Sequence, residues 1–273
     1  MKKSTVFSKL YIGVILVLVY LPILVVLAYS FNASRTSSVW DGFSLKWYAE
    51  LFRDRAMFEA LCNSVVLGVL SSLCAGIIGT LGAVGMQRAH LRSGKVMEYF
   101  STLPIMIPEI ILGLVFLVFF SLLGLPFGMF TLVLAHTSFC IPYVYLLVKA
   151  RLAGMDKSYV EAARDLGAGD VRAFFDITLP LVAPAVVSGM LLAFAMSFDD
   201  VIISGMITGV NVNTLPLKVF SQIKTNVTPK TNAMFTLLFL ATILLGALSA
   251  WVGRPHKGQN EKYNHKQKTE EQK

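Results

Sequence analysis

Long apolar runs alternate with short polar segments along this chain. Each run approaches or exceeds the roughly 20 apolar residues that a helix needs to cross the hydrocarbon core of a bilayer. The pattern therefore predicts an all-α membrane protein with six transmembrane helices. The predicted spans cover residues 10–31, 61–86, 98–121, 128–149, 181–207 and 233–252.

The composition agrees with residence in a membrane. Hydrophobic residues make up 55% of the 273 residues and charged residues 15%, and the mean hydropathy is +0.67. These values exclude an ordinary soluble domain. Cys62, Cys74 and Cys140 lie in or beside apolar runs and lack metal-ligand spacing, so we expect neither a disulfide framework nor a metal site.

The first apolar run has two interpretations. Lys2, Lys3 and Lys9 precede it, as basic residues precede the apolar part of a signal peptide. However, residues 10–34 carry no charge, and this stretch is longer than the usual apolar region of about 7–15 residues. We therefore expect an uncleaved membrane anchor.

The distribution of basic residues predicts the orientation of the chain. Lys and Arg favour the cytoplasmic side of a membrane protein. We therefore expect both termini and the 149–180 segment to be cytoplasmic, and this orientation explains the net charge of +8 without a nucleic-acid partner. The segments expected inside, 1–9, 87–97, 149–180 and 253–273, carry three, three, five and six Lys or Arg residues, against four in 32–60 and three in 208–232.

Three parts follow from these spans. Residues 1–60 form an N-terminal transmembrane helix with an outer loop, and residues 61–252 form a five-helix core. Residues 253–273 form a cytoplasmic tail that is rich in Lys, Gln, Asn and Glu. Because the tail has no apolar periodicity, we expect it to be disordered.

A polar segment at residues 157–180 interrupts the apolar pattern. Asp156 or Ser158 can cap a helix that runs through Leu166, and Gly167 suits the end of that helix. A second helix is predicted from Asp170 through Ile177, with Pro180 separating it from the fifth span. On composition alone, such helices could also lie flat at the lipid interface.

The spacing of residues in this segment resembles the EAA signature of permease subunits of ATP-binding-cassette importers. This resemblance implies a type I importer permease fold in which the loop docks on an ATPase subunit. Asp170 lies in the same coupling loop. The matching positions are Glu161, Ala162, Ala163, Gly167, Ile177, Leu179 and Pro180.

Further motifs make the chain similar to spermidine/putrescine importer permeases of the PotC type. They include the segments at residues 31–35, 108–110 and 197–201. Glu109 stands where that family usually has aspartate, and Asp170 stands where glutamate is usual. The resemblance implies roles in substrate uptake for Trp47, Glu109, Asp170, Ser197, Asp199 and Asp200.

The chemistry of these residues suits a flexible polycation. Carboxylates attract ammonium groups, and aromatic faces hold them by cation–π contacts. Glu109 lies midway along the predicted third span, where an ionised side chain costs at least ~2.5–3.5 kcal/mol; it faces the substrate path, or is a structural carboxylate bonded to a neighbouring helix. Asp199 and Asp200 point about 100° apart on a helix, so we expect one to face the path and the other to pack or cap.

Two further side chains complete the predicted path. The Ser197 hydroxyl can hydrogen-bond to a carboxylate or an ammonium group. Trp47 lies in the predicted outer loop, where a binding protein delivers substrate in the resembled family. Tryptophan also commonly anchors chains at the headgroup region, which is the alternative role for Trp47.

The resemblance also implies the partners of this chain. They are a second homologous permease subunit, two ATP-binding subunits that hold ATP-Mg, and an external polyamine-binding protein. No Gly-rich loop ending in Lys and Ser or Thr occurs here, so we expect the chain to bind no nucleotide and to have no catalysis of its own.

Two alternative functions stay open at this point. The chain could import another solute, such as a different amine or an organophosphonate. Gly167-Ala168-Gly169-Asp170 also matches the GxGD string of intramembrane aspartyl proteases. Such enzymes need paired carboxylates within the membrane, whereas Asp170 lies in a charged loop, so this alternative is the weaker one.

Overall fold

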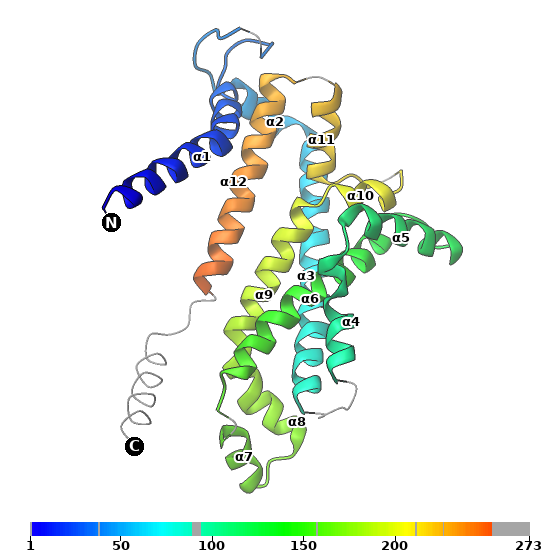
Figure 1. The fold of residues 1–273 in the computed structure, drawn as a ribbon. Coiled ribbons are helices and arrows are strands. Elements are labelled where there is room, and N and C mark those ends of the chain that lie inside the picture. The colour runs from blue at the N-terminus through cyan, green and yellow to red at the C-terminus, as the bar shows by residue number, and fades with distance from the viewer. Residues whose placement is uncertain are drawn as a thin grey trace. The chain divides into compact units, whose positions relative to one another are not determined.

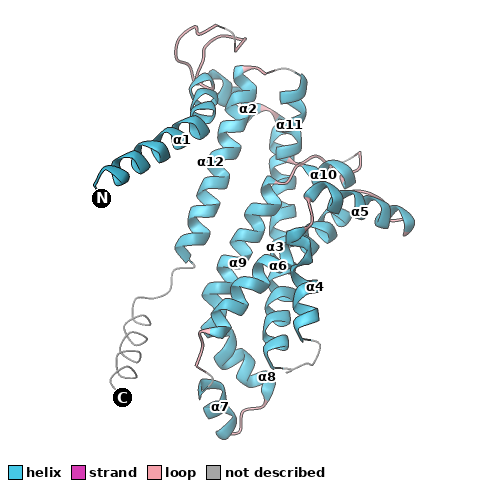
Figure 2. Ribbon diagram, in the orientation of Figure 1, coloured by secondary structure: helices cyan, strands magenta, loops and turns pink. Residues whose placement is uncertain are grey.

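The computed structural model describes residues 2–37, 39–88, 94–156, 158–210, 212–225 and 227–252. Every named element in this part of the chain is helical (Figures 1 and 2). The elements are α1 (Lys2–Tyr29), α2 (Lys46–Arg53), α3 (Arg55–Arg88), α4 (Gly94–Met106), α5 (Glu109–Leu122), α6 (Met129–Ala153), α7 (Ser158–Asp165), α8 (Asp170–Ala173), a π-helix (Phe174–Thr178), α9 (Leu179–Asp199), α10 (Ile202–Ile207), α11 (Leu215–Thr225) and α12 (Pro229–Val252).

The helices confirm an all-α fold with membrane-spanning segments. Five helical segments are long and apolar enough to cross a bilayer, and the number is six if the bent pair α4 and α5 forms one span. None of the most apolar window of α1 is buried within the chain. The apolar surface of α1 therefore requires lipid or another chain to cover it.

The predicted third span, residues 98–121, was wrong as a single helix because the chain breaks between α4 and α5. Pro108 has extended backbone angles, φ −54° and ψ 135°. Proline has no N–H to donate and disfavours helical angles in the residue before it. The Pro108 carbonyl accepts hydrogen bonds from the N–H groups of Ile111 and Leu112, so Pro108, two residues after the end of α4, begins α5.

The predicted fifth span, residues 181–207, also differs from the structure. α9 ends at Asp199, and α10 begins at Ile202 after a break at Asp200 and Val201. At its other end, α9 continues without interruption from the coupling loop, as one helical run from Asp170 to Asp199. Pro180 therefore does not separate the loop from the span.

The π-helix gives a physical reason for this continuity. Proline in a helix removes one donor, and its ring presses on the carbonyl four residues earlier. A π-helical turn widens the backbone at such a point. Phe174–Thr178 adopts this turn and ends two residues before Pro180, so the helix accommodates the proline instead of ending at it.

The chain divides into two compact units. The first comprises Met1–Val69, Ile107–His136 and Ser197–Ile243. Within it α5 packs against α10 (Figure 1). Gly113 makes this packing close, because a Cβ at this position would lie 2.7 Å from the Met206 sulfur. Within this unit Lys230 on α12 also forms ion pairs with Glu50 and Asp54.

The second unit comprises Leu70–Met106, Thr137–Met196 and Leu244–Lys273. Its helices meet at small residues, which let the backbones approach closely. A Cβ on Gly189 would lie 3.0 Å from the Val144 Cα, and one on Gly79 would lie 3.0 Å from the Val144 Cβ. Val144 of α6 is completely buried between these glycines.

Some predictions lie beyond these findings. The tail at residues 253–273 is outside the residues that the structure describes. The division at residue 60, the cytoplasmic orientation of the termini and the uncleaved state of the first span stay predictions.

Candidate functional site

Three carboxylates gather in the first unit, where α9 ends and α5 begins. Asp199 is the last residue of α9, Asp200 lies in the break before α10, and Glu109 is the first residue of α5. The packing of α5 against α10 brings the helix that begins with Glu109 to the segment that follows the two aspartates. All three side chains lie at or beside the two helix breaks. The hydrophobic pattern did not predict these breaks.

Asp200 is the buried member of this group, with 8% of its surface exposed. Its Oδ1 accepts a hydrogen bond from the Ile203 N–H at 3.2 Å, and its Oδ2 accepts one from the Ser204 N–H at 2.7 Å. These are the free N–H groups at the start of α10, so Asp200 caps this helix. The expectation that one of the two aspartates packs or caps is met by Asp200.

His136 completes the surroundings of Asp200. The side chain is fully buried, and its Nε2 lies 3.5 Å from the Asp200 Oδ2. The ring also lies within hydrogen-bonding distance of two hydroxyls, with 2.7 Å between Nδ1 and the Ser197 Oγ and 3.2 Å between Nε2 and the Ser204 Oγ. His136 thus connects α6 with the end of α9 and with α10.

The sequence contains a signal for His136, although no motif in the sequence analysis identified this residue. A histidine in the apolar run of α6 is costly unless it faces polar partners. The partners of His136 lie 61 and 68 residues away along the chain, so only the fold identifies them. Ser197 is 3% exposed and its hydroxyl contacts this ring; its predicted contact with a carboxylate or an ammonium group stays a prediction.

Asp199 and Glu109 differ from Asp200 in exposure, since both side chains are exposed in this chain. Among the described residues, neither forms an ion pair. Ionised carboxylates form strong, charge-assisted hydrogen bonds with ammonium groups. The pair can therefore receive the ammonium groups of a solute, which is the chemistry expected of a cation-conducting path.

Trp47 lies in a separate cluster of the first unit. Its Nε1 donates a hydrogen bond to the Asn32 carbonyl at 2.8 Å, and the ammonium group of Lys46 lies 4.7 Å from its ring centroid. Asn32 is completely buried, so Trp47 is held against the loop that follows α1. A role of Trp47 in uptake stays a prediction.

The coupling loop has the predicted helix–turn–helix form. Gly167 ends the first helix with φ +87°, in the left-handed region that favours glycine. The Gly167 N–H donates to the Arg164 carbonyl at 2.8 Å, and the Ala168 N–H donates to the Ala163 carbonyl at 3.0 Å. This pair of hydrogen bonds is the Schellman motif, which satisfies the last carbonyls of α7.

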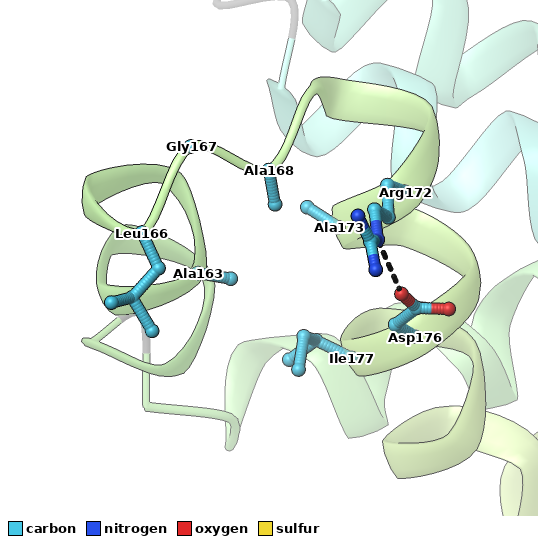
Figure 3. A pocket seen from close by; sticks show the side chains of 8 residues that line it. All are labelled: Ala163, Leu166, Gly167, Ala168, Arg172, Ala173, Asp176 and Ile177. Atoms are coloured by element: carbon cyan, nitrogen blue, oxygen red, sulfur yellow. Dashed lines mark hydrogen bonds and ion pairs between the residues drawn. The ribbon is translucent and has the colours of Figure 1, made fainter.

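The turn folds α7 against α8 and the π-helix. Figure 3 shows the two sides of the loop facing one another across a groove of about 250 Å3. Ala163 projects into it from α7 and Ile177 from the π-helix, and Arg172 forms an ion pair with Asp176 at 3.2 Å beside it. Small apolar side chains inside and charges at the edge suit contact with another protein.

The other signature residues lie along the same loop. Glu161 and Ala162 are exposed on α7, and Asp156 accepts a hydrogen bond from the Ser158 N–H at 3.0 Å as predicted for the helix start. Leu179 is half-buried and Pro180 is exposed in the first turn of α9. The exposed signature residues are available to a partner, whereas Gly167 shapes the turn.

Asp170 does not resemble a protease aspartate. It is exposed at the start of α8 and accepts a hydrogen bond from the Arg164 guanidinium at 2.5 Å. An aspartyl protease instead needs two carboxylates that share a proton. In the part of the chain that the structure describes, no three His, Cys, Asp or Glu side chains come together to hold a metal ion.

Known proteins share this architecture and sequence. Residues 75–254 match the family model of the binding-protein-dependent transport system inner membrane component. The chain is 38% identical over 235 residues to the spermidine/putrescine transport system permease protein PotC of Haemophilus influenzae, covering 86% of this chain and 91% of that protein. It is 41% identical over 239 residues to the putrescine transport system permease protein PotI of Escherichia coli K12, covering 85% of each.

Solved structures agree on the fold. A bacterial transporter that imports the polysaccharide alginate matches with a TM-score of 0.70 and 16% identity over 90% of this chain and 95% of that one. The MetNI methionine transporter matches with a TM-score of 0.61 and 16% identity over 74% of this chain and 97% of that one. Together with the sequence relatives, which are transport permeases rather than enzymes, these matches set the protease alternative aside. The chain belongs to the family of inner membrane components of binding-protein-dependent transport systems, as a multi-pass permease subunit.

Proposed function

We propose that this permease imports polyamines, namely spermidine, putrescine or both. The observation that carries the proposal is that Glu109 and Asp199 are exposed and have no ion-pair partner among the described residues, whereas Asp200 lies 3.5 Å from the buried His136 ring. The named relatives that transport spermidine and putrescine support the same substrate class.

The charge pattern suits a polyamine better than a neutral solute. Two neighbouring carboxylates without cationic partners repel one another. A flexible molecule with several ammonium groups can neutralise both without a rigid fit. Binding then removes the repulsion between the carboxylates as well as adding new contacts, so affinity depends on both side chains.

The family implies an assembly, and we propose its composition. A second homologous permease pairs with this chain to enclose the path, and two ATP-binding subunits that hold ATP-Mg dock on the coupling loops. An external polyamine-binding protein delivers the solute. The exposed residues Glu161 and Ala162 and the groove between Ala163 and Ile177 support docking at the 157–180 loop.

Transport by this assembly follows an alternating-access cycle. Closure of the ATPase subunits pushes the compact α7–α8 pair as a rigid body, and the spans swing so that the carboxylates meet the released solute. The helical run from Asp170 to Asp199 is unbroken, which supports transmission of this push along one element. Hydrolysis in the partner subunits then resets the cycle.

The test is ATP-dependent uptake of labelled spermidine into proteoliposomes that contain the permease with its partner subunits and binding protein. Putrescine and an unrelated amine serve as competitors. We expect the two polyamines, but not the unrelated amine, to displace the label. If the binding protein stimulates ATP hydrolysis but no polyamine enters, the substrate assignment is wrong and another solute must be sought.

Variants test the residues that carry the proposal. We expect Asp199→Asn and Glu109→Gln each to raise the KM for spermidine about tenfold or more, since each removes one charge-assisted contact. Glu59→Gln is the matched control, because Glu59 is a carboxylate exposed on α3 that forms an ion pair with Arg55, four residues earlier. Unchanged uptake in both path variants would contradict the assignment of the path.

A further inference from the structure

His136 is a buried titratable group that the transport cycle above does not use. Its side chain is 0% exposed. The ring faces three polar side chains of the first unit: Ser197 on α9, Asp200 in the break and Ser204 on α10. His136 of α6 therefore contacts polar groups before, within and after the break between α9 and α10, which directly follows Asp199.

The hydrogen-bond geometry limits the role that the ring can play. Nε2 lies between the Ser204 Oγ at 3.2 Å and the Asp200 Oδ2 at 3.5 Å. A carboxylate accepts but does not donate, so we assign the proton to Nε2, the nitrogen that faces Asp200. Nδ1 then accepts from the Ser197 hydroxyl in the neutral ring, or donates to it in the charged ring. With this assignment the ring directs an N–H toward Asp200 in both states.

Asp200 needs such a partner. Burial of an unpaired carboxylate is unfavourable by several kcal/mol, and removal of one member of a buried pair leaves that penalty in place. Two backbone N–H groups of α10 contribute to its stabilisation. Without His136 the carboxylate would have to leave this position to find water, and the start of α10 would lose its cap.

The neighbouring carboxylate has the opposite environment. Asp199 is exposed and Asp200 is 8% exposed, although the two are adjacent. The break turns the chain between them, so a displacement of Asp200 also displaces Asp199. α10 in turn packs on α5, the helix that begins with Glu109.

Resting on the proposed polyamine function, we infer that His136 is a positioning residue for the substrate site. It holds Asp200 as the cap of α10 and thereby fixes the break so that Asp199, with Glu109, meets the ammonium groups. Asp200 stabilises the backbone next to Asp199 and is not itself a substrate ligand. The two adjacent aspartates thus have different tasks, which the sequence motif alone does not separate.

A double-mutant cycle tests the inference by spermidine uptake in the complete transporter. We expect His136→Leu to raise KM about tenfold or more, because it leaves a buried carboxylate unpaired. The double variant H136L/D200N removes both the donor and the charge, so its KM is expected to return to within about threefold of wild type. His136→Gln, whose amide can still donate to Asp200, should keep KM within the same range.

The outcomes separate a positioning role from a general structural one. H136L/D199N should show no recovery, because Asp199 is a ligand in this scheme. If H136L/D200N is as impaired as H136L, or if D200N alone raises KM as much as D199N, Asp200 is a ligand and the inference is overturned. Normal uptake in H136L would overturn it as well.

Cysteine labelling tests the same relationship without any solute. Cys62, Cys74 and Cys140 are first replaced by serine in the complete transporter. Asp199→Cys should then react with a cationic thiosulfonate reagent at least about ten times faster than Asp200→Cys, and H136L should narrow this difference. Equal rates with His136 present would overturn the inference, whereas failure of polyamine uptake with the expected labelling would contradict the proposed function alone.

Discussion

Arg164 and Asp170 form an ion pair across the turn of the coupling loop, with 2.5 Å between Nη2 and Oδ1. Arg164 lies in the last turn of α7 and Asp170 begins α8. Both side chains are largely exposed, so the pair itself contributes at most about 1 kcal/mol. The turn that brings them together depends on the backbone at Gly167.

Gly167→Ala should therefore impair coupling between ATP hydrolysis and transport. A side chain at φ +87° is unfavourable by about 1–2 kcal/mol, which is enough to open the Schellman turn and separate α7 from α8. We expect a lower rate of binding-protein-stimulated ATP hydrolysis with unchanged expression.

Gly169→Ala is the matched control for this variant. Gly169 lies two residues later with φ −67°, and a Cβ there would meet no atom within 4 Å. We expect normal stimulation of hydrolysis in G169A. Equal loss in the two variants would show that the loop tolerates no alanine, irrespective of the left-handed conformation.

Gly189→Ala should lower the thermal stability of the protein in detergent. The added methyl would lie 3.0 Å from the Val144 Cα, and a backbone atom cannot move aside as a flexible side chain can. Overpacking of this kind is typically unfavourable by about 1–3 kcal/mol. The measurement is the midpoint of thermal unfolding.

Gly85→Ala provides the opposite expectation in the same unit. A Cβ on Gly85 meets no atom within 4 Å, and alanine in a helix interior is favoured over glycine by about 0.5–1 kcal/mol. G85A should raise the midpoint slightly. A rise in both variants would mean that α6 and α9 can separate at no cost.

The length of the Glu109 side chain should tune substrate affinity. Aspartate keeps the charge but is shorter by one methylene, which withdraws the carboxylate from the proposed polyamine site. We expect Glu109→Asp to raise the KM for spermidine less than Glu109→Gln does, since the charge is retained. Equal effects of the two variants would show that position, rather than charge, governs binding.

Asp54 should make stability depend on pH in the acidic range. Partial burial by itself raises the pKa of this carboxyl, but hydrogen bonds from the Met57 N–H and the Lys230 ammonium and the positive charge of Lys218 outweigh it and hold the pKa below its usual range. A lowered folded-state pKa stabilises the protein above the unfolded-state pKa. That contribution is lost as the pH falls through the folded-state pKa.

Thermal unfolding at several pH values checks this expectation. The midpoint should fall as the pH drops below about 4, the ordinary range of aspartate. Asp54→Asn should have a lower midpoint at neutral pH and a flatter acid profile. Asp41→Asn, in the exposed loop after α1, is the control, and an identical profile in D54N and wild type would contradict the role of Asp54.

Local patterns determined much of this protein. The apolar runs are long because a helix must cross a fixed thickness of hydrocarbon, so the all-α membrane fold could be read from them. The two helices of the coupling loop could also be predicted, since a glycine at the end of α7 and an acidic residue at the start of α8 are local signals. The expectation that one aspartate caps also follows from local geometry, because adjacent residues on a helix point in different directions.

Only the tertiary structure decided which carboxylate is buried. Asp200 is the buried one because His136, on another helix, and the first N–H groups of α10 surround it. Such pairing joins residues more than 60 positions apart, and hydropathy says nothing about which polar group in one span faces which in another. The hydrophobic pattern did not predict the breaks at Pro108 and at Asp200 for the same reason. An apolar run indicates that a segment lies in the membrane, whereas hydrogen bonds to its backbone decide where the helix ends.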